Sequence, residues 1–331
     1  MLARPSLRLH HAVHAGSLRG SLGLTSLAAP GPCFHHHGIS LEASASQPIP
    51  MARSKLRLHA MSSSLAQNSV PASQPRQLPP HTSIPPPSLP SGIAAWESAV
   101  VLIDKPQGWT SFDVCAKLRF ALSRTLDKKA RTIKVGHAGT LDPMATGLLV
   151  VCVGRATKLV ESLMAASKRY SGTMRLGEGT PSLDAETPVH ETKPWQHVTE
   201  ASLEAAAEAF LGEQEQIPPM YSAISVDGQR LYDSARKGLE VERKSRRITV
   251  HSLRLQRSAE DPQGVDFVVS CSKGTYVRSL AADLAAHMGT VAHLTALRRL
   301  SSGEHDVAAA WQLPDLISQL GDLKKEDAAQ A

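Results

Sequence analysis

Acidic side chains are almost missing from the first 96 residues of this 331-residue chain. Glu42 is the single one, against seven Lys and Arg, so this segment carries the whole formal charge of +6 and the rest of the chain is neutral. An acid-poor segment with scattered Arg and Ser is typical of an organellar presequence, and the Pro- and Ser-rich stretch 71–90 has a composition that does not pack a core. We therefore expect residues 1–96 to be a presequence and disordered linker directed to a mitochondrion or a chloroplast, which the sequence does not distinguish. An ordinary disordered tail is the alternative.

Long apolar runs and paired cysteines are also lacking. No run approaches the roughly 20 residues that a membrane-spanning helix needs, so we expect no membrane partner. The four cysteines are scattered, without a Cys-x-x-Cys pair or a Cys/His spacing that suggests zinc. Cys152 and Cys271 lie in apolar runs, which predicts small core residues. We expect a reducing compartment, no structural disulfide and no metal.

The rest of the chain alternates between strand and helix patterns without strict order, which predicts an α+β domain with a mixed sheet. We place this domain at residues 97–315, followed by a short C-terminal tail at 316–331. Phe112, Cys115, Leu118 and Leu122 share one helical face. The expected strands are 99–103, 148–153, 169–176, 221–226, 248–255 and 265–271, the last two as a hairpin, and the expected helices are 111–122, 156–166, 200–212, 229–238 and 277–289.

Asp142 is the most informative single residue. It lies in the run Gly-Thr-Leu-Asp-Pro at 139–143, and the following proline biases it away from the helical conformation. Glycines on both sides, at positions 136, 139 and 147, allow tight turns. This pattern predicts a carboxylate presented on a rigid loop where a ligand can reach it. The local chemistry alone is equally that of an Asx-turn or a helix cap.

Six segments in fixed order resemble the TruB family of tRNA pseudouridine synthases, over roughly residues 98–315. Their motifs are short but characteristic, and together they cover nearly all of the chain that looks foldable. They are Val101–Pro106 with Gly108–Ser111, Lys134–Leu149, Lys168–Tyr170, Gln216–Ala223, Gly274–Arg278, and Ala292–Thr295 with Leu297–Leu300.

The resemblance implies the pseudouridine synthase fold, with a central, mixed, largely antiparallel sheet flanked by helices. It implies cofactor-free conversion of uridine to pseudouridine, at uridine 55 in the TΨC stem-loop of tRNA, by a monomer. Asp142 would be the catalytic carboxylate, able to act as nucleophile or base. Arg278 would pair with it, since a guanidinium stays charged and can bind a carboxylate bidentately. Tyr170 would stack on the extruded base and help in proton transfer.

Read without the motifs, Arg278 would be a surface helix residue, and Tyr170 a packing residue of a strand. His137 resembles the family histidine that fills space in the RNA loop after the base leaves, although a loop histidine can also be merely exposed. Basic residues must offset the cost of base flipping through phosphate contacts. The predicted substrate-binding residues are His137, Lys105, Gly139, Thr140, Leu141, Tyr221, Asp184, Tyr276 and Arg298. Further candidate phosphate contacts are Lys128, Lys129, Arg131, Lys134, Arg230, Arg236, Lys237 and Arg299.

Two positions depart from the family pattern. Ser225 stands where the family often has lysine, so one phosphate contact is expected to be missing. Ser182 replaces the second threonine of a Thr-x-Thr-x-Asp pattern, whose Asp184 is expected to structure the site. Few residues follow Leu313, so we also expect that the small C-terminal RNA-binding domain of bacterial members is absent.

Three other functions fit parts of this pattern. One is an RNA-binding chaperone without catalysis, which would not require Asp142, Tyr170 and Arg278. Another is a pseudouridine synthase acting on mRNA or rRNA, which the sequence leaves open. A glycosidase-like hydrolase would need paired carboxylates, and no second carboxylate accompanies Asp142 locally.

Overall fold

The computed structural model describes residues 80–86, 88–90, 93–226 and 228–330. All of them belong to a compact unit that spans residues 72–331. Residues 1–79, with the expected presequence and Cys33, lie outside the described residues. No helix in the described part of the chain has the length and hydrophobicity needed to cross a membrane.

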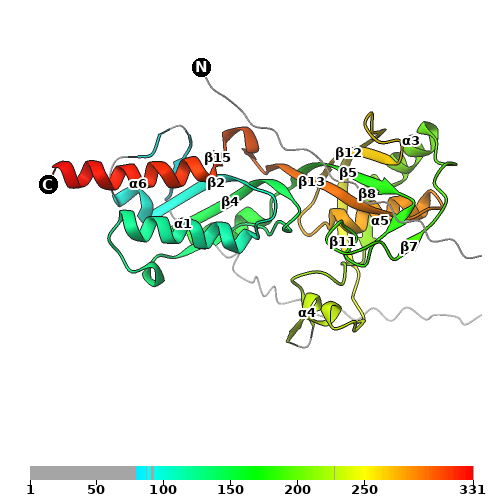
Figure 1. The fold of residues 1–331 in the computed structure, drawn as a ribbon, viewed down its shortest axis with the longest axis horizontal. Coiled ribbons are helices and arrows are strands. Elements are labelled where there is room, and N and C mark those ends of the chain that lie inside the picture. The colour runs from blue at the N-terminus through cyan, green and yellow to red at the C-terminus, as the bar shows by residue number, and fades with distance from the viewer. Residues whose placement is uncertain (1–79, 87, 91–92, 227, 331) are drawn as a thin grey trace, which may run out of the picture. The chain divides into compact units, whose positions relative to one another are not determined.

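An eleven-stranded sheet forms the centre of the unit (Figure 1). Its main path runs in the order β1-β2-β4-β13-β5-β12-β11-β8, with β3 on β4, β14 on β13 and β15 on β2. The pairs β1–β2, β15–β2 and β13–β4 are parallel and the others are antiparallel, which confirms a mixed, largely antiparallel sheet. The strands are β1 (Thr82–Ile84), β2 (Ser98–Lys105), β3 (Val135–His137), β4 (Thr146–Gly154), β5 (Lys168–Leu176), β8 (Gly212–Gln216), β11 (Arg246–Arg257), β12 (Gly264–Cys271), β13 (Ala292–Ser302), β14 (His305–Asp306) and β15 (Trp311–Gln312).

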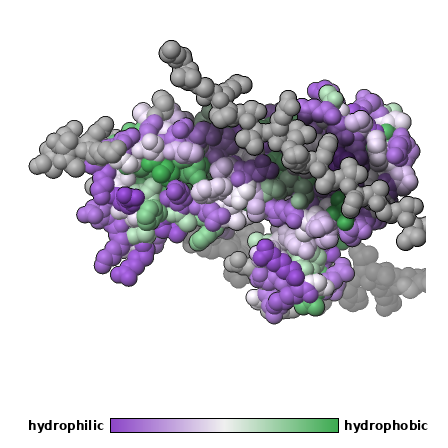
Figure 2. Space-filling model, in the orientation of Figure 1, coloured by the Kyte–Doolittle hydropathy of each residue, from purple (hydrophilic) through white to green (hydrophobic). Residues whose placement is uncertain are grey.

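In the described part of the chain, six α-helices accompany the sheet. In Figure 1, α1 and α6 lie side by side over β2 and β4, α3 and α5 accompany the β5–β12–β11 region, and α4 projects away from the sheet. Figure 2 shows apolar side chains gathered over α1 and α6, while polar side chains cover most of the rest of this face. The helices are α1 (Ser111–Thr125), α2 (Val160–Met164), α3 (Glu200–Ala209), α4 (Leu231–Arg236), α5 (Val277–His287) and α6 (Leu313–Gln330). Short 3₁₀ turns are η1 (Ile93–Glu97), η2 (Ala130–Thr132), η3 (Arg155–Leu159) and η4 (Val307–Ala309), and two small ribbons are β6–β7 (Glu178–Gly179, Glu191–Thr192) and β9–β10 (Ser225–Val226, Gln229–Arg230).

The core is split by strand alternation. Leu149 and Val151 of β4 face α1 and α6, whereas Leu148 and Val150 face the other side of the sheet. Consecutive residues of a strand point to opposite faces, so one buried strand supports two cores. A third cluster joins β5, β12 and β13 to α3 and α5.

Most expected elements are confirmed, including the hairpin of β11 and β12 and the helix that begins after Thr110. Thr110 caps α1 through a capping box with Asp113. Cys115, Cys152 and Cys271 are free and buried, as expected.

Three expectations about local structure were wrong, and one central strand was missed. Phe112 is 64% exposed, because the buried stripe of α1 starts one position earlier, at Ser111. The expected helix 156–166 is a 3₁₀ turn followed by the short α2, and within the expected strand 221–226 only Ser225–Val226 is a strand. Strand β13 was not predicted at all.

The folded domain is wider than the predicted 97–315. At its start, β1 pairs with β2, Ile84 is buried, and the Trp311 indole Nε1 donates to the Ile84 carbonyl at 3.0 Å. At its end, Leu316 and Leu320 of α6 are buried against α1. The Pro-rich segment cannot build a core of its own, but three of its residues complete the edge of a sheet that already exists.

Candidate active site

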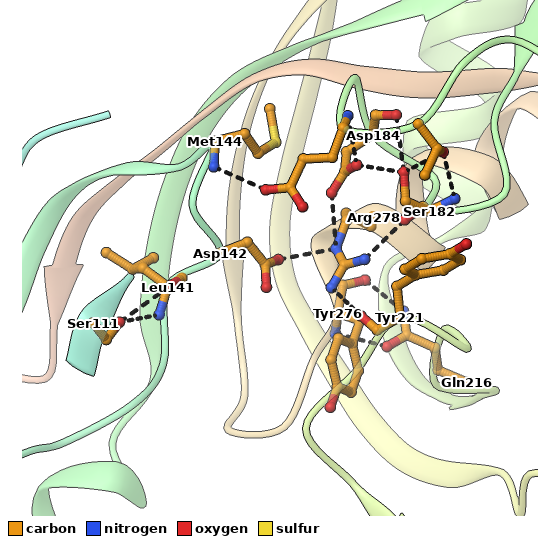
Figure 3. Close-up of polar contacts among 12 residues, drawn as sticks. Ser111, Leu141, Asp142, Met144, Ser182, Asp184, Gln216, Tyr221, Tyr276 and Arg278 are labelled. Atoms are coloured by element: carbon orange, nitrogen blue, oxygen red, sulfur yellow. Dashed lines mark hydrogen bonds and ion pairs between the residues drawn. The ribbon is translucent and has the colours of Figure 1, made fainter. Parts of the chain in front are cut away.

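Asp142 lies in the loop that connects β3 to β4, and neighbouring elements hold this loop by its backbone (Figure 3). The buried Ser111 hydroxyl accepts from the Leu141 N–H at 2.8 Å and donates to the Leu141 carbonyl at 3.1 Å. The Gly108 N–H donates to the Pro143 carbonyl at 2.8 Å, and the Met144 N–H donates to Glu186 Oε1 at 3.2 Å. The residues on both sides of Asp142 are therefore fixed, which confirms the rigid loop that the sequence predicted.

Arg278 lies in the first turn of α5, and its guanidinium points toward the Asp142 carboxylate (Figure 3). Its Nε is 2.9 Å from Asp142 Oδ2 and 3.6 Å from Asp184 Oδ2. Its two terminal nitrogens donate to the Ser182 and Tyr221 carbonyls, each at 2.8 Å. The predicted pair is present, but it is not bidentate, because the terminal nitrogens bind backbone instead. The Arg278 side chain is 3% exposed, whereas that of Asp142 is 33% exposed.

Asp184 is a buried support of this arrangement. Its Oδ1 accepts from the Ser182 hydroxyl at 2.5 Å and from the Glu186 N–H at 3.0 Å. These bonds fold the loop whose Ser182 carbonyl receives Arg278. Asp184 thus structures the site, as the sequence predicted, and Ser182 supplies a hydroxyl at the position of the family threonine.

Burial and the Arg278 charge shift the pKa of Asp142 in opposite directions. Burial raises the pKa of Asp142, the Arg278 guanidinium lowers it in part, and the Asp184 carboxylate adds to the rise. A raised pKa makes the Asp142 carboxylate a stronger base. Burial also raises the pKa of Glu186, with Asp184 again adding to the effect.

A cleft of about 290 Å³ opens above Asp142. Tyr170 of β5 lines it, with its ring 9% exposed, and burial raises the pKa of its hydroxyl, partly opposed by Arg299. Tyr276 lines it from the start of α5, with the Arg246 guanidinium 5.3 Å from its ring centre. Gly139, Thr140 and Leu141 complete the wall formed by the loop that carries Asp142. The cleft thus combines a partly open carboxylate with aromatic side chains.

A larger hollow of about 840 Å³ adjoins this cleft, sharing Met164, Arg246 and Gly274 with it. Lys244 and Lys273 are exposed along it. In the described part of the chain, no cluster of His, Cys, Asp and Glu is suited to hold a metal ion.

Comparisons with known proteins cover the region that builds the cleft. Residues 125–277 match the family described as "TruB family pseudouridylate synthase (N terminal domain)". The chain is 46% identical to the tRNA pseudouridine synthase B of Flavobacterium johnsoniae over 214 aligned residues. The aligned residues cover 65% of this chain and 92% of the relative. The chain is 50% identical to the tRNA pseudouridine synthase B of Opitutus terrae over 221 aligned residues, which cover 67% of this chain and 87% of the relative.

The chain belongs to the TruB family.

The fold supports this assignment. The solved structure "Crystal Structure of a Cbf5-Nop10-Gar1 Complex" matches with a TM-score of 0.52 and 27% identity, over 70% of this chain and 57% of that chain. The predicted family and the predicted fold class are both confirmed.

Five of the predicted substrate-binding residues of this TruB family member do not line the cleft: Lys105, Arg298, His137, Tyr221 and the buried Asp184. The Lys105 side chain is fully buried, and its ammonium donates to the carbonyls of Trp109 at 2.6 Å, Pro106 at 3.0 Å and Pro143 at 3.4 Å. Burial lowers its pKa to about 8. Lys105 therefore braces the loop that carries Asp142 and has no surface with which to bind a phosphate. Arg298 points to the opposite face of the sheet, where it binds Asp104 bidentately at 2.7 and 3.0 Å.

Two others contribute differently from the prediction. His137 is half-buried in β3, outside the lining of the cleft. Burial and the Arg299 charge lower its pKa, which favours the neutral imidazole. Tyr221 contributes its carbonyl, which accepts from Arg278. The side chain of Arg230 lies outside what the structure describes.

The sequence did not identify three residues that hold the site together. The Gln216 side-chain amide pairs with the Tyr276 backbone at the start of α5. Its oxygen accepts from the Tyr276 N–H at 2.8 Å, and its nitrogen donates to the Tyr276 carbonyl at 3.1 Å. Ser111 holds Leu141, and Arg299 was considered only as a phosphate contact although it is 1% exposed. The alternation of a strand through Leu297–Leu300 would have separated Arg298 from Arg299, had β13 been recognised.

Proposed function

We propose that this protein isomerises uridine to pseudouridine in tRNA, at uridine 55 of the TΨC loop, without a cofactor. The observation that carries the proposal is the partly exposed Asp142 carboxylate held at the mouth of the cleft by the buried Arg278. The support for tRNA comes from relatives named tRNA pseudouridine synthase B at 42–50% identity.

The reaction conserves all atoms of the nucleotide. The C1′–N1 bond breaks and a C1′–C5 bond forms, while C5 loses a proton and N1 gains one. Asp142 can add to C1′ or to C6 of the base, or can take a proton. Burial raises its pKa, which makes the carboxylate a stronger base, and the Arg278 charge beside it favours the ionised form.

Access to Asp142 requires that the uridine leave its stack, at a cost of a few kcal/mol. Tyr170 and Tyr276 offer aromatic faces to the extruded base. Exposed Lys244 and Lys273 along the adjoining hollow can offset the cost through phosphate contacts.

A hydrolase that uses paired carboxylates is less well supported. The sequence suggested that no second carboxylate accompanies Asp142, and this was wrong in space. A second carboxylate does accompany Asp142 in space, because Asp184 approaches the same Arg278 nitrogen. Asp184 is 1% exposed and its Oδ1 accepts two hydrogen bonds, so substrate has no route to it.

The direct test uses purified protein and an unmodified tRNA transcript, with pseudouridine mapped at every position. A transcript with cytidine at position 55 is the matched control. Conversion at position 55 of the first transcript and none of the second is the expected result. Conversion elsewhere in tRNA, or only in mRNA or rRNA, would contradict the proposed target, and RNA binding without conversion would indicate a chaperone.

We also propose that the protein acts in a mitochondrion or chloroplast. The support is the basic, acid-poor composition of the N-terminal segment. Residues 1–79 fused to a fluorescent protein should carry it into one of the two organelles. A fusion that stays in the cytosol would contradict the location.

A further inference from the structure

Among the described residues that line the cleft, Arg299 is the most deeply buried cation. It is 1% exposed, and among the described residues no carboxylate forms an ion pair with it, unlike Arg278 and Arg298. A buried charge without a counter-ion is costly. An ion pair therefore does not explain why a guanidinium is present at this position.

The hydrogen bonds of Arg299 join the sheet to the catalytic loop. Its Nε donates to the Leu148 carbonyl at 2.6 Å, and a terminal nitrogen donates to the Gly139 carbonyl at 3.1 Å. Leu148 belongs to β4, and Gly139 lies three residues before Asp142. Gly139 has a φ of +109°, and a Cβ added there would stand 3.4 Å from the other terminal nitrogen. The loop thus bends closely around the guanidinium.

Arg299 is also the cross-strand partner of Tyr170. The β13–β5 register places the two residues opposite each other, so their side chains leave the sheet on the same face as neighbours. Both line the cleft. The planar fork of an arginine can bind two carbonyls and still lie against the phenol, whereas a lysine ammonium offers a single nitrogen.

We propose that Arg299 is a positioning residue, which fixes the Tyr170 phenol relative to the loop that carries Asp142. Arg299 holds the loop through Gly139 and the sheet through Leu148, and Tyr170 is its cross-strand neighbour. The inference rests on the proposed function, because the positions of Tyr170 and Asp142 matter to a uridine that lies between them.

The test is a double-mutant cycle on the full chain, with Arg299→Lys and Tyr170→Phe, on an unmodified tRNA transcript. Single-turnover rates are measured at saturating enzyme, with RNA affinity and thermal melting alongside. Arg299→Lys should slow the chemical step by about tenfold to 100-fold, with RNA affinity unchanged within about twofold. In the Tyr170→Phe background the same change should cost less than about threefold, because the phenol that Arg299 positions is already gone. A purely structural arginine would cost the same in both backgrounds, and that result would overturn the proposal.

Arg175→Lys is the matched control for the exchange of arginine for lysine. Arg175 lies further along the same β5 strand, where it pairs with Glu178 and Asp261 on the surface. It should leave the chemical step unchanged, and an equal loss in both variants would contradict a specific role for Arg299. Failure of the proposed function is distinguishable, because the wild-type protein would then form no pseudouridine.

A second measurement covers the case in which Arg299→Lys does not fold. The Nε–H of Arg299 is followed by ¹⁵N NMR in wild-type protein and in Tyr170→Phe, which removes one hydroxyl only. The proposal predicts that the Arg299 signal shifts while that of Arg175 does not. An unmoved Arg299 signal would overturn it.

Discussion

Two adjacent arginines of β13, Arg298 and Arg299, lie on opposite faces of the sheet and have different partners. Arg298 faces one side, where its charge is paired bidentately with Asp104 and its side chain is 39% exposed. Arg299 faces the cleft, where it is buried and binds carbonyls of β4 and of the catalytic loop. Lys105 and Arg278 belong with Arg299, since both are buried and donate to backbone carbonyls around Asp142. The comparison indicates that Lys105, Arg278 and Arg299 fix the geometry of the loop that carries Asp142. Arg298 instead forms an ion pair on the other face of the sheet.

We expect the largest effect from a substitution of Asp142, whose loop these buried cations hold in place. Asp142→Asn should abolish product formation, because asparagine keeps the shape but cannot act as nucleophile or base. Affinity for tRNA should stay within a few fold. The measurement is conversion of an unmodified transcript together with a binding titration. Residual conversion by the pure variant would rule out the role given to Asp142.

Arg278→Lys should be the next most damaging change. Lysine keeps the charge beside Asp142 but cannot also donate to the Ser182 and Tyr221 carbonyls. We expect a chemical step slower by about 100-fold. Because Arg278 is 3% exposed, a loss of about 1–3 kcal/mol in the free energy of unfolding should accompany it.

Single-turnover kinetics and a denaturant melt on the same preparation separate these two effects. Arg175→Lys, which makes the same exchange at an arginine of β5 that pairs with Glu178 and Asp261, serves as the control. A chemical step within about threefold of wild type, well short of the penalty expected for misplacement, would mean that Arg278 supplies charge only.

Truncation at the N-terminus should separate stability from chemistry. A chain that begins at residue 80 keeps β1, whereas one that begins at residue 93 loses the buried Ile84 and the acceptor of the Trp311 indole. We expect the shorter chain to lose about 3 kcal/mol in the free energy of unfolding, with an unchanged chemical step below its melting temperature. Equal melting of the two chains would show that β1 adds nothing to the domain.

The smallest effect is expected in the titration of Lys105, whose pKa burial lowers from 10.5 to about 8. Between these values the unfolded chain binds more protons at this position than the folded chain, so the stability contributed by Lys105 rises with pH. Wild type should therefore gain about 1–3 kcal/mol in unfolding free energy relative to Lys105→Met between pH 8 and 10.5. Urea unfolding across this range is the measurement. Parallel pH profiles, or a falling difference, would contradict it.

The sequence by itself determined the family, the position of Asp142 on a rigid loop and most of the elements. The reason is that these depend on local signals: the glycines and proline around Asp142, the capping box at Thr110, and the apolar runs of β4 and β12. Arg278 could be assigned because its motif places it in the first turn of a helix, which the structure confirms.

Tertiary structure decided what each charged side chain does. Whether Lys105 binds a phosphate or braces Pro143 depends on a contact between residues 38 positions apart, and the pairing of Arg278 with Ser182 spans 96 positions. Asp184 becomes a neighbour of Asp142 only when its loop folds over α5. The edge strand β1 forms because β2 offers unpaired backbone groups, which the composition of a Pro-rich segment does not reveal. Local sequence sets conformation, but the burial of a charge and its partners are properties of segments that only the folded sheet brings together.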